Sequence, residues 1–305
     1  MDYRKVQVIA GRGEAPGRFA ESLRGLAVDA QDRLYAVGDS KVVVFSPGGA
    51  VERSWATKLP GYCVAVAPDG TVYVGQEGQV QLFAADGTPG DTWRDGDRLG
   101  VISSIGLTDD AVLLGDATAR CIHRYERSST KLNSSTKFNF ALPDRFVSDI
   151  GKNNRMRGFM LPNGHMDFAV DGQAVIHAAH SGKHRVERYD LDGKLLGQFG
   201  RFDGTDPVGF PGCCNPTNLA LTVEGQVVVT EKASPRVKVY DADGKLRAHF
   251  GEQDFDANCR NMDVAVDTRG RVYVIDTVRL QVVVYNPEDV AATQPTTAAT
   301  QRVQP

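Results

Sequence analysis

The chain has 305 residues, with 35 lysines and arginines against 38 aspartates and glutamates and a formal net charge of −3. We expect no nucleic-acid partner, because nucleic-acid-binding domains carry a strongly basic face. No apolar run approaches the roughly 18–20 residues that span a bilayer, so no membrane span is expected. The first ten residues lack the apolar stretch of a signal peptide. A mature exported protein would look the same, which leaves the compartment open.

One hairpin pattern recurs six times along the chain. Each copy has a short apolar strand, a turn rich in aspartate and glycine, and a strand in which valine or tyrosine alternates with other residues. The 32 glycines agree with a turn-rich β protein. In chain order the copies are GLAVDAQDRLYAV (25–37), CVAVAPDGTVYV (63–74), IGLTDDAVLL (105–114), FAVDGQAVIHA (168–178), LALTVEGQVVV (219–229) and VAVDTRGRVYV (264–274).

The spacing of the copies predicts a propeller. Successive copies lie 38 to 63 residues apart, counted between Val28, Val66, Leu107, Val170, Leu221 and Val266. Periods of about 40–50 residues with four short strands each are typical of propeller blades. No segment shows a sustained helical period, which disfavours a βα barrel. We therefore expect an all-β protein, a six-bladed β-propeller with four-stranded blades.

The two ends of the repeat array complement each other. The last copy supplies three strands, near 262–267, 271–276 and 280–285, and a further strand, KVQVIAG at 5–11, precedes the first copy. We expect this N-terminal strand to complete the last blade and to close the ring, which removes exposed sheet edges. Residues 1–289 then form one propeller. The tail at 290–305, rich in threonine, alanine, glutamine and proline, is expected to be disordered.

Two further features strengthen the assignment. The segment HRVERYDLDGKLLGQFG (184–200) has a close copy ending in YDADGKLRAHFG (240–251), and glycine–phenylalanine steps occur at Gly17/Phe19, Gly158/Phe159 and Gly209/Phe210. Over residues 5–288 the chain resembles the NHL-repeat family of six-bladed β-propellers. The resemblance implies the fold. It leaves the function open, because such propellers serve as binding platforms, sensor domains, lactonases and lyases.

Three of the five cysteines precede inner strands of adjacent copies. Cys214 and Cys259 occupy aligned positions, and Cys213 is adjacent to the first of them. We expect the three thiols to converge at one mouth of the central channel and to bind a zinc, copper or iron ion or an iron–sulfur cluster. His165 is the nearest candidate for a further ligand. The alternatives are a Cys214–Cys259 or Cys213–Cys214 disulfide, and reduced structural thiols.

One position near the start of the inner strands is polar in five copies. These side chains are expected to ring the channel and to need ordered water or a bound ion as partners. Carboxylate and amide oxygens at this level suit Ca²⁺, as in lactonase-type propellers. A channel that holds only water is the alternative. The residues are Cys63, Ser104, Asp167, Asn218 and Asp263, with Gly25 in the first copy.

Several charged residues are expected near the same mouth. The loops between second and third strands carry His180, Glu231, Asp276 and Arg279, and a histidine beside a carboxylate suits general acid–base chemistry. A structural loop role is the alternative. The long connection at 143–164 brings Arg155 and Arg157, either to attract an anionic ligand or to remain solvated.

These observations favour a monomeric, non-enzymatic binding platform with a cysteine-rich site at one face of the channel. Its partner there is expected to be a protein or a small anionic ligand. One alternative is a metal-dependent lyase or hydrolase, which needs an open coordination position and a nearby base. The related peptidyl-hydroxyglycine lyases use a histidine-rich zinc site, where this chain offers cysteine. The other alternative is an interaction module stabilised by a disulfide.

Overall fold

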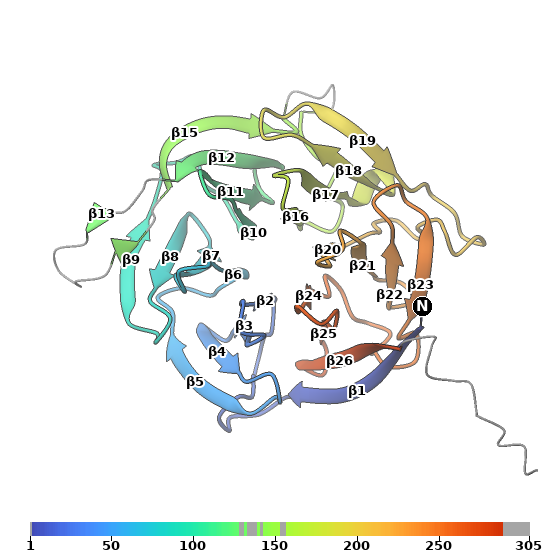
Figure 1. Cartoon of the computed structure of the whole chain (residues 1–305), viewed down its shortest axis with the longest axis horizontal. Coiled ribbons are helices and arrows are strands. Elements are labelled where there is room, and N and C mark those ends of the chain that lie inside the picture. Colours follow the sequence, from blue (N-terminus) through green and yellow to red (C-terminus); the bar gives the residue numbers. More distant parts are fainter. Residues whose placement is uncertain (1, 128–130, 133–138, 141–142, 153–156, 289–305) are drawn as a thin grey trace, which may run out of the picture.

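The computed structural model describes residues 2–127, 131–132, 139–140, 143–152 and 157–288. In this part of the chain six four-stranded antiparallel sheets surround a central axis, which confirms the predicted six-bladed propeller (Figure 1). The one helical element among these residues is a turn of 3₁₀-helix, Ser181–Lys183. The described residues contain no helix that is long and apolar enough to cross a membrane. Arg155 and the predicted disordered tail at 290–305 lie outside the described residues.

Each blade runs from an inner strand at the channel to an outer strand at the rim. Blades 1 and 2 consist of β2 (Gly25–Val28), β3 (Leu34–Gly38), β4 (Lys41–Phe45) and β5 (Val51–Ala56), then β6 (Cys63–Val66), β7 (Val72–Gln76), β8 (Gln79–Phe83) and β9 (Pro89–Trp93). Blade 3 consists of β10 (Ile102–Leu107), β11 (Ala111–Asp116), β12 (Cys121–Arg127) and β15 (Pro143–Ile150). A separate two-stranded pair is formed by β13 (Lys131–Leu132) and β14 (Asn139–Phe140).

Blades 4 to 6 follow in the same order. Blade 4 consists of β16 (Phe168–Val170), β17 (Ile176–His180), β18 (Arg185–Tyr189) and β19 (Leu195–Phe199). Blade 5 consists of β20 (Asn218–Leu221), β21 (Val227–Glu231), β22 (Arg236–Tyr240) and β23 (Leu246–Phe250). Blade 6 consists of β24 (Val264–Val266), β25 (Val272–Asp276), β26 (Gln281–Glu288) and β1 (Asp2–Ala10). The six inner strands end at the six residues from which the repeat spacing was measured.

The ring closes through the N-terminal strand, as predicted. β1 pairs antiparallel with β26, from Asp2 opposite Glu288 to Ala10 opposite Gln281. Figure 1 shows β1 as the outermost strand beside β26, so the last blade combines both ends of the repeat array. Closure leaves every blade with four strands, and no blade exposes the edge of a central strand.

The segment at 143–164 differs from the prediction of one long loop. Its first part is β15, the outer strand of blade 3, which pairs with β12 through contacts such as Asp149 opposite His123. Tyr125 lies opposite Phe146 in the same pair of strands. Gly164, at the end of the segment, lines a cavity at the channel mouth. Arg157 in this part is exposed.

The core lies between neighbouring blades. Phe19 packs with Leu26 and Val43 of blade 1 and with residues of blade 6, such as Val282. The phenylalanines of the three glycine–phenylalanine steps are all fully buried; they are Phe19, Phe159 and Phe210. Burial of such large side chains between rigid sheets fixes where the connecting loops lie, and these loops surround the channel mouth.

Candidate site at the channel mouth

The polar positions near the start of the inner strands join neighbouring blades. The thiol of Cys63 donates a hydrogen bond to the carbonyl of Ile102 at 3.4 Å, from blade 2 to blade 3. The hydroxyl of Ser104 donates to the carbonyl of Phe168 at 3.0 Å, from blade 3 to blade 4. Both side chains also line a cavity of about 320 Å³ within the channel. The ring therefore has a structural use, which is to connect adjacent inner strands.

Two aspartates and an asparagine continue this ring. Asp167 accepts a hydrogen bond from the backbone N–H of Leu219 at 2.7 Å, and Asp263 accepts one from that of Leu26 at 2.7 Å. Nδ2 of Asn218 donates to Oδ1 of Asp263 at 3.1 Å. Oδ1 of Asn218 is buried and has no hydrogen-bond partner among the described residues. Since both carboxylates already bind backbone N–H groups, they serve as inter-blade acceptors.

Both channel aspartates ionise less readily than an ordinary aspartate. Burial raises the pKa of Asp167 well above its usual value, and the nearby charge of Asp263 raises it further. Burial also raises the pKa of Asp263, to about 6. A carboxyl group that ionises less readily in the folded state makes folding less favourable once the pH exceeds its normal pKa.

We expect Asp263→Asn to become more stable relative to the wild type as the pH rises from about 4 to about 7. The wild-type carboxyl must ionise over this range in an environment that resists ionisation, and the amide does not. Because the channel opens to water, we expect a relative gain of about 1–3 kcal/mol in the free energy of unfolding. Urea unfolding at four pH values would measure it. Asp192→Asn, with a side chain 88% exposed, is the control. A relative stability that does not change with pH would contradict the expectation.

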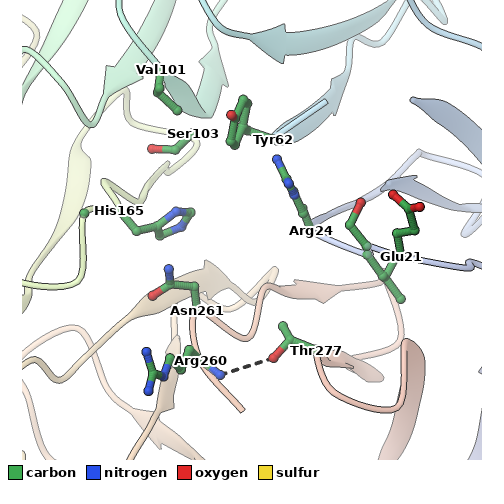
Figure 2. Close-up of a pocket in the computed structure, with 12 residues that line it drawn as sticks. Glu21, Arg24, Tyr62, Val101, Ser103, His165, Arg260, Asn261 and Thr277 are labelled. Carbon is green, nitrogen blue, oxygen red and sulfur yellow. Dashed lines mark hydrogen bonds between the residues drawn. The ribbon is translucent and has the colours of Figure 1, made fainter. Parts of the chain in front are cut away.

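A cavity of about 310 Å³ opens at the end of the channel where the inner strands begin (Figure 2). Its polar lining comes from five of the six blades, because the inner strands begin at this end of the channel. The backbone N–H groups of two lining residues are bonded to second strands, Arg24 to Val37 at 2.9 Å and Tyr62 to Gly75 at 2.8 Å. The side chains that matter below are Arg24, Tyr62, Ser103, His165, Arg260 and Asn261.

Arg24 brings a positive charge and a buried donor to this mouth. Its guanidinium carbon lies 4.6 Å from the ring centroid of Tyr62, and Figure 2 shows the two side chains next to each other. Nη1 of Arg24 is buried and has no hydrogen-bond partner in the described chain. A buried donor without an acceptor is costly, by about 1–3 kcal/mol. Sequence reasoning missed Arg24, since a single arginine before a strand has no distinguishing pattern.

His165 lies in this cavity and not beside the cysteines. Its Nε2 accepts a hydrogen bond from Nδ2 of Asn218 at 2.8 Å. Burial lowers the pKa of His165 to about 4, so the imidazole is neutral near pH 7. Across the mouth, Asn163 donates to the side chain of Asn261 at 3.0 Å. The end of the 143–164 connection therefore reaches the mouth, through Asn163 and Gly164.

The three predicted cysteine ligands are not gathered into one group. The sulfur atoms of Cys213 and Cys214 lie 2.8 Å apart, whereas the thiol of Cys259 donates to Oδ1 of Asp276 at 3.2 Å. Cys259 packs into the apolar core between blades 5 and 6, in the same cluster as Met262. All five cysteines are free thiols, so the structure has no Cys214–Cys259 disulfide.

Three of the predicted mouth residues lie inside their blades. His180, Glu231 and Asp276 are each 0% exposed and end the second strand of blades 4, 5 and 6. Nδ1 of His180 donates to Glu187 at 2.9 Å, while its Nε2 accepts from the backbone N–H of Met160. These contacts hold the second and third strands together, so the three residues are not available at the mouth.

The partners of Glu231 and Asp276 likewise lie within their own blades. Glu231 lies 2.8 Å from Nζ of Lys238, itself 0% exposed, and accepts from Arg236. Asp276 accepts from the backbone N–H groups of Val278 at 3.0 Å and Arg279 at 2.7 Å. The Arg279 guanidinium turns back onto Asp276 at 3.1 Å.

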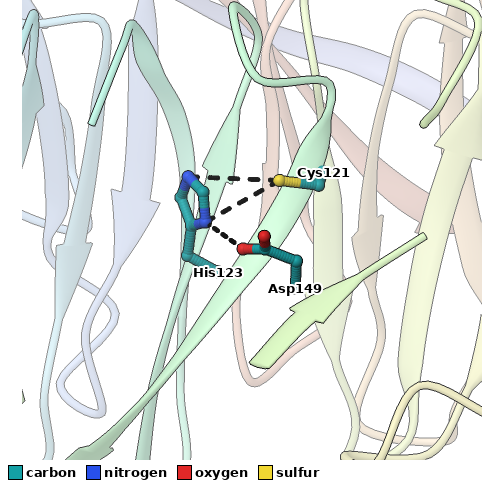
Figure 3. Close-up of side chains that lie close together, drawn as sticks. All are labelled: Cys121, His123 and Asp149. Carbon is teal, nitrogen blue, oxygen red and sulfur yellow. Dashed lines mark hydrogen bonds and ion pairs between the residues drawn. The ribbon is translucent and has the colours of Figure 1, made fainter. Parts of the chain in front are cut away.

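Blade 3 holds a cysteine, a histidine and an aspartate together (Figure 3). Nδ1 of His123 lies 2.6 Å from Asp149 and 3.7 Å from the sulfur of Cys121. Such sulfur, nitrogen and oxygen donors are the ligand types of zinc. Sequence reasoning missed the group, because Asp149 was assigned to a loop and lies on a strand next to β12. It is the one potential metal-ligand group among the described residues.

Other blades have an equivalent pair of ionisable residues, one at the end of the second strand and one at the third residue of the third strand. The pair is Asp116 and His123 in blade 3, His180 and Glu187 in blade 4, and Glu231 and Lys238 in blade 5. Although burial opposes it, hydrogen bonds with Asp116, Cys121 and Asp149 raise the pKa of His123 to about 10. The imidazole is therefore protonated near pH 7, and a metal ion would have to displace that proton. The repeat of the pair favours a structural role.

No protein-family model matches the chain, and no curated protein is significantly similar to it in sequence. Solved structures share its fold. A protein of unknown function from Bacteroides thetaiotaomicron is 13% identical with a TM-score of 0.62, over 93% of this chain and 75% of that one. Virginiamycin B lyase from Staphylococcus aureus is 9% identical with a TM-score of 0.62, over 94% and 100%. The WD40 β-propeller domain of Doa1 is 12% identical with a TM-score of 0.60, over 94% and 97%. At these identities the likeness concerns the fold alone, and it places this chain among the β-propellers.

Proposed function

We propose that the protein is a binding platform that takes a small anionic ligand in the cavity at the channel mouth. The observation that carries the proposal is the guanidinium of Arg24, a residue that lines this cavity and whose buried Nη1 has no partner among the described residues. A carboxylate or phosphate oxygen is the partner that such a group binds best. The β-propeller suits this use, because its rigid blades position loops around one central opening.

The charges of the lining support an anion over a cation. Arg24 and Arg260 both line the cavity, and Glu21 carries the one carboxylate among the described residues of the lining. The side-chain amide of Asn261 adds a neutral donor to the same lining. The ring of Tyr62 holds the Arg24 guanidinium in place through a cation–π contact, which reduces the entropy lost on binding.

Binding is favoured over catalysis at this mouth. A lyase or hydrolase would need a general base, and His165 is the imidazole that lines the cavity. With its pKa lowered to about 4 by burial, His165 is a weak base near neutral pH. The predicted centre at Cys213, Cys214 and Cys259 forms no part of the proposal, because the structure does not gather the three sulfurs.

We expect Arg24→Ala to weaken binding of a small anion by about 10- to 100-fold. Loss of one charged hydrogen bond corresponds to about 1.5–3 kcal/mol, and 1.4 kcal/mol is tenfold in affinity. The probes are inorganic phosphate, succinate and citrate, with glycerol as the uncharged control, and calorimetry is the readout. Arg4→Ala, whose side chain is 72% exposed on β1, is the matched arginine control. The proposal fails if none of the three anions binds the wild type, or if Arg24→Ala binds them equally well.

A further inference from the structure

The loop before β20 carries two adjacent cysteines with unequal surroundings. The sulfur atoms of Cys213 and Cys214 lie 2.8 Å apart and share a hydrogen bond. Cys213 is exposed, whereas Cys214 is 2% exposed. The other three cysteines are all buried, so Cys213 is the one thiol that solutes can reach. An exposed thiol beside a buried one is the arrangement in which the first reacts with a solute and the second reacts with the first.

A buried asparagine fixes the shape of this loop. Asn215 is 0% exposed, and its Nδ2 donates to the carbonyls of Pro211 at 2.7 Å and Lys232 at 2.9 Å. Its Oδ1 accepts from the backbone N–H of Lys232 at 2.9 Å. These three bonds tie the cysteine loop to the turn between β21 and β22. The two thiols are thereby held close together on a rigid support.

The electrostatic environment separates the roles of the two thiols. The hydrogen bond from Cys214 lowers the pKa of Cys213, and the positive charge of Lys232 lowers it further. Burial raises the pKa of Cys214. The thiolate is the reactive form of cysteine, so Cys213 is the nucleophile of the pair. Cys214 remains protonated until a mixed disulfide has formed on Cys213.

We propose that Cys213 and Cys214 form a thiol–disulfide exchange site that reacts with small-molecule disulfides. The Cys213 thiolate attacks one sulfur of the disulfide RSSR, its S–S bond breaks, and RS⁻ leaves and takes up a proton. The Cys214 thiol loses its proton to solvent and attacks the Cys213 sulfur of the mixed disulfide, expelling a second RS⁻. The protein dithiol is oxidised to a Cys213–Cys214 disulfide, and RSSR is reduced to two RSH.

The product is expected to be readily reduced again. Adjacent residues joined by a trans peptide have Cα atoms about 3.8 Å apart, below the roughly 4.4–6.8 Å of ordinary disulfides. Strained and exposed disulfides have higher reduction potentials and are the labile ones. The pair is therefore suited to reversible exchange rather than to permanent stabilisation of the propeller.

The test is intact-mass spectrometry of the reduced, full-length protein after anaerobic mixing with oxidised glutathione at neutral pH. We expect the wild type to lose two hydrogens, to retain no glutathione, and to yield a peptide with Cys213 linked to Cys214. Cys214→Ser should trap one glutathione on Cys213. Cys213→Ser should react at least about tenfold more slowly than the wild type, because its remaining thiols are buried. Cys259→Ser is the control and should behave as the wild type.

Two results would overturn the proposal. One is a wild type that retains glutathione on Cys213 as Cys214→Ser does, since the second thiol would then not act. The other is a wild type in which Cys213 reacts no faster than the buried Cys259. Should a serine variant fail to fold, the peptide map of the wild type still distinguishes a Cys213–Cys214 disulfide from a mixed disulfide.

Discussion

Deletion of residues 2–10 is expected to prevent the chain from forming a stable closed propeller. These residues are β1, the outer strand of blade 6, and their loss exposes the edge of β26 along its whole length. Val282 to Tyr285 of β26 are at most 1% exposed in the intact ring, and Ile9 of β1 belongs to the core between blades 6 and 1. Since a domain is stable by only about 5–15 kcal/mol, loss of one strand in the ring removes most of that stability.

Circular dichroism melting and size-exclusion chromatography would measure the effect. We expect the truncated chain to lose its cooperative transition or to associate through the open edge. A synthetic peptide of residues 2–12 should restore the transition in trans, because it supplies the missing strand. Val8→Ala, whose side chain is 44% exposed, is the control and should leave melting nearly unchanged. A truncated monomer that melts like the full chain would show that closure by β1 is dispensable.

Replacement of Glu187 by leucine is expected to lower the free energy of unfolding by about 3–5 kcal/mol. Glu187 is 2% exposed and lies on β18, the third strand of blade 4, between β17 and β19. It accepts hydrogen bonds from His180 at 2.9 Å and Tyr189 at 2.5 Å and pairs with Arg185. Leucine would leave these three groups without their acceptor inside the blade. Urea unfolding would measure the change, with Glu14→Leu, at an exposed position, as the control.

The pH dependence of Glu187 provides an independent check. Although burial opposes ionisation, hydrogen bonds from His180 and Tyr189 and the charge of His180 hold the pKa of Glu187 at about 2, below its usual 4.5. The ionised form therefore stabilises the fold above about pH 4.5, and this contribution is lost as the pH falls towards 2. We expect it to amount to about 3 kcal/mol. Glu187→Gln should lose less stability than the wild type over this range; equal losses would contradict the assignment.

The fold could be predicted from local patterns in the chain. Alternation of apolar residues and the aspartate–glycine turns define each hairpin, because strands show a period of two and tight turns need particular residues. The repeat spacing then places the inner strands. Because the last copy supplies only three strands of a four-stranded blade, the N-terminal strand is predicted to be the fourth. The polar register of Asp167, Asn218 and Asp263 was predicted in the same way, since equivalent positions of a repeat occupy equivalent places in space.

The candidate site depended on contacts that the repeat pattern does not contain. His180 and Glu231 were expected at the mouth, but buried partners on the third strand hold them inside their blades. Cys259 aligns with Cys214 in the sequence, yet the Cys259 thiol binds Asp276 whereas the Cys214 thiol binds Cys213. Alignment gives the position of a backbone, whereas the direction of a side chain follows from what packs around it.

The sequence by itself determined the architecture of this protein: six blades, the closure by β1 and the polar ring of the channel. These follow from short-range periodicity and from repetition, which a single chain displays directly. Only the tertiary structure decided which groups are left without partners. The Nη1 of Arg24, which has no partner in the described part of the chain, and the close pair of Cys213 and Cys214 become visible only in the folded structure. The reason is physical: hydrogen bonding and burial are properties of the surroundings of a group, and those surroundings come from several distant segments of the chain.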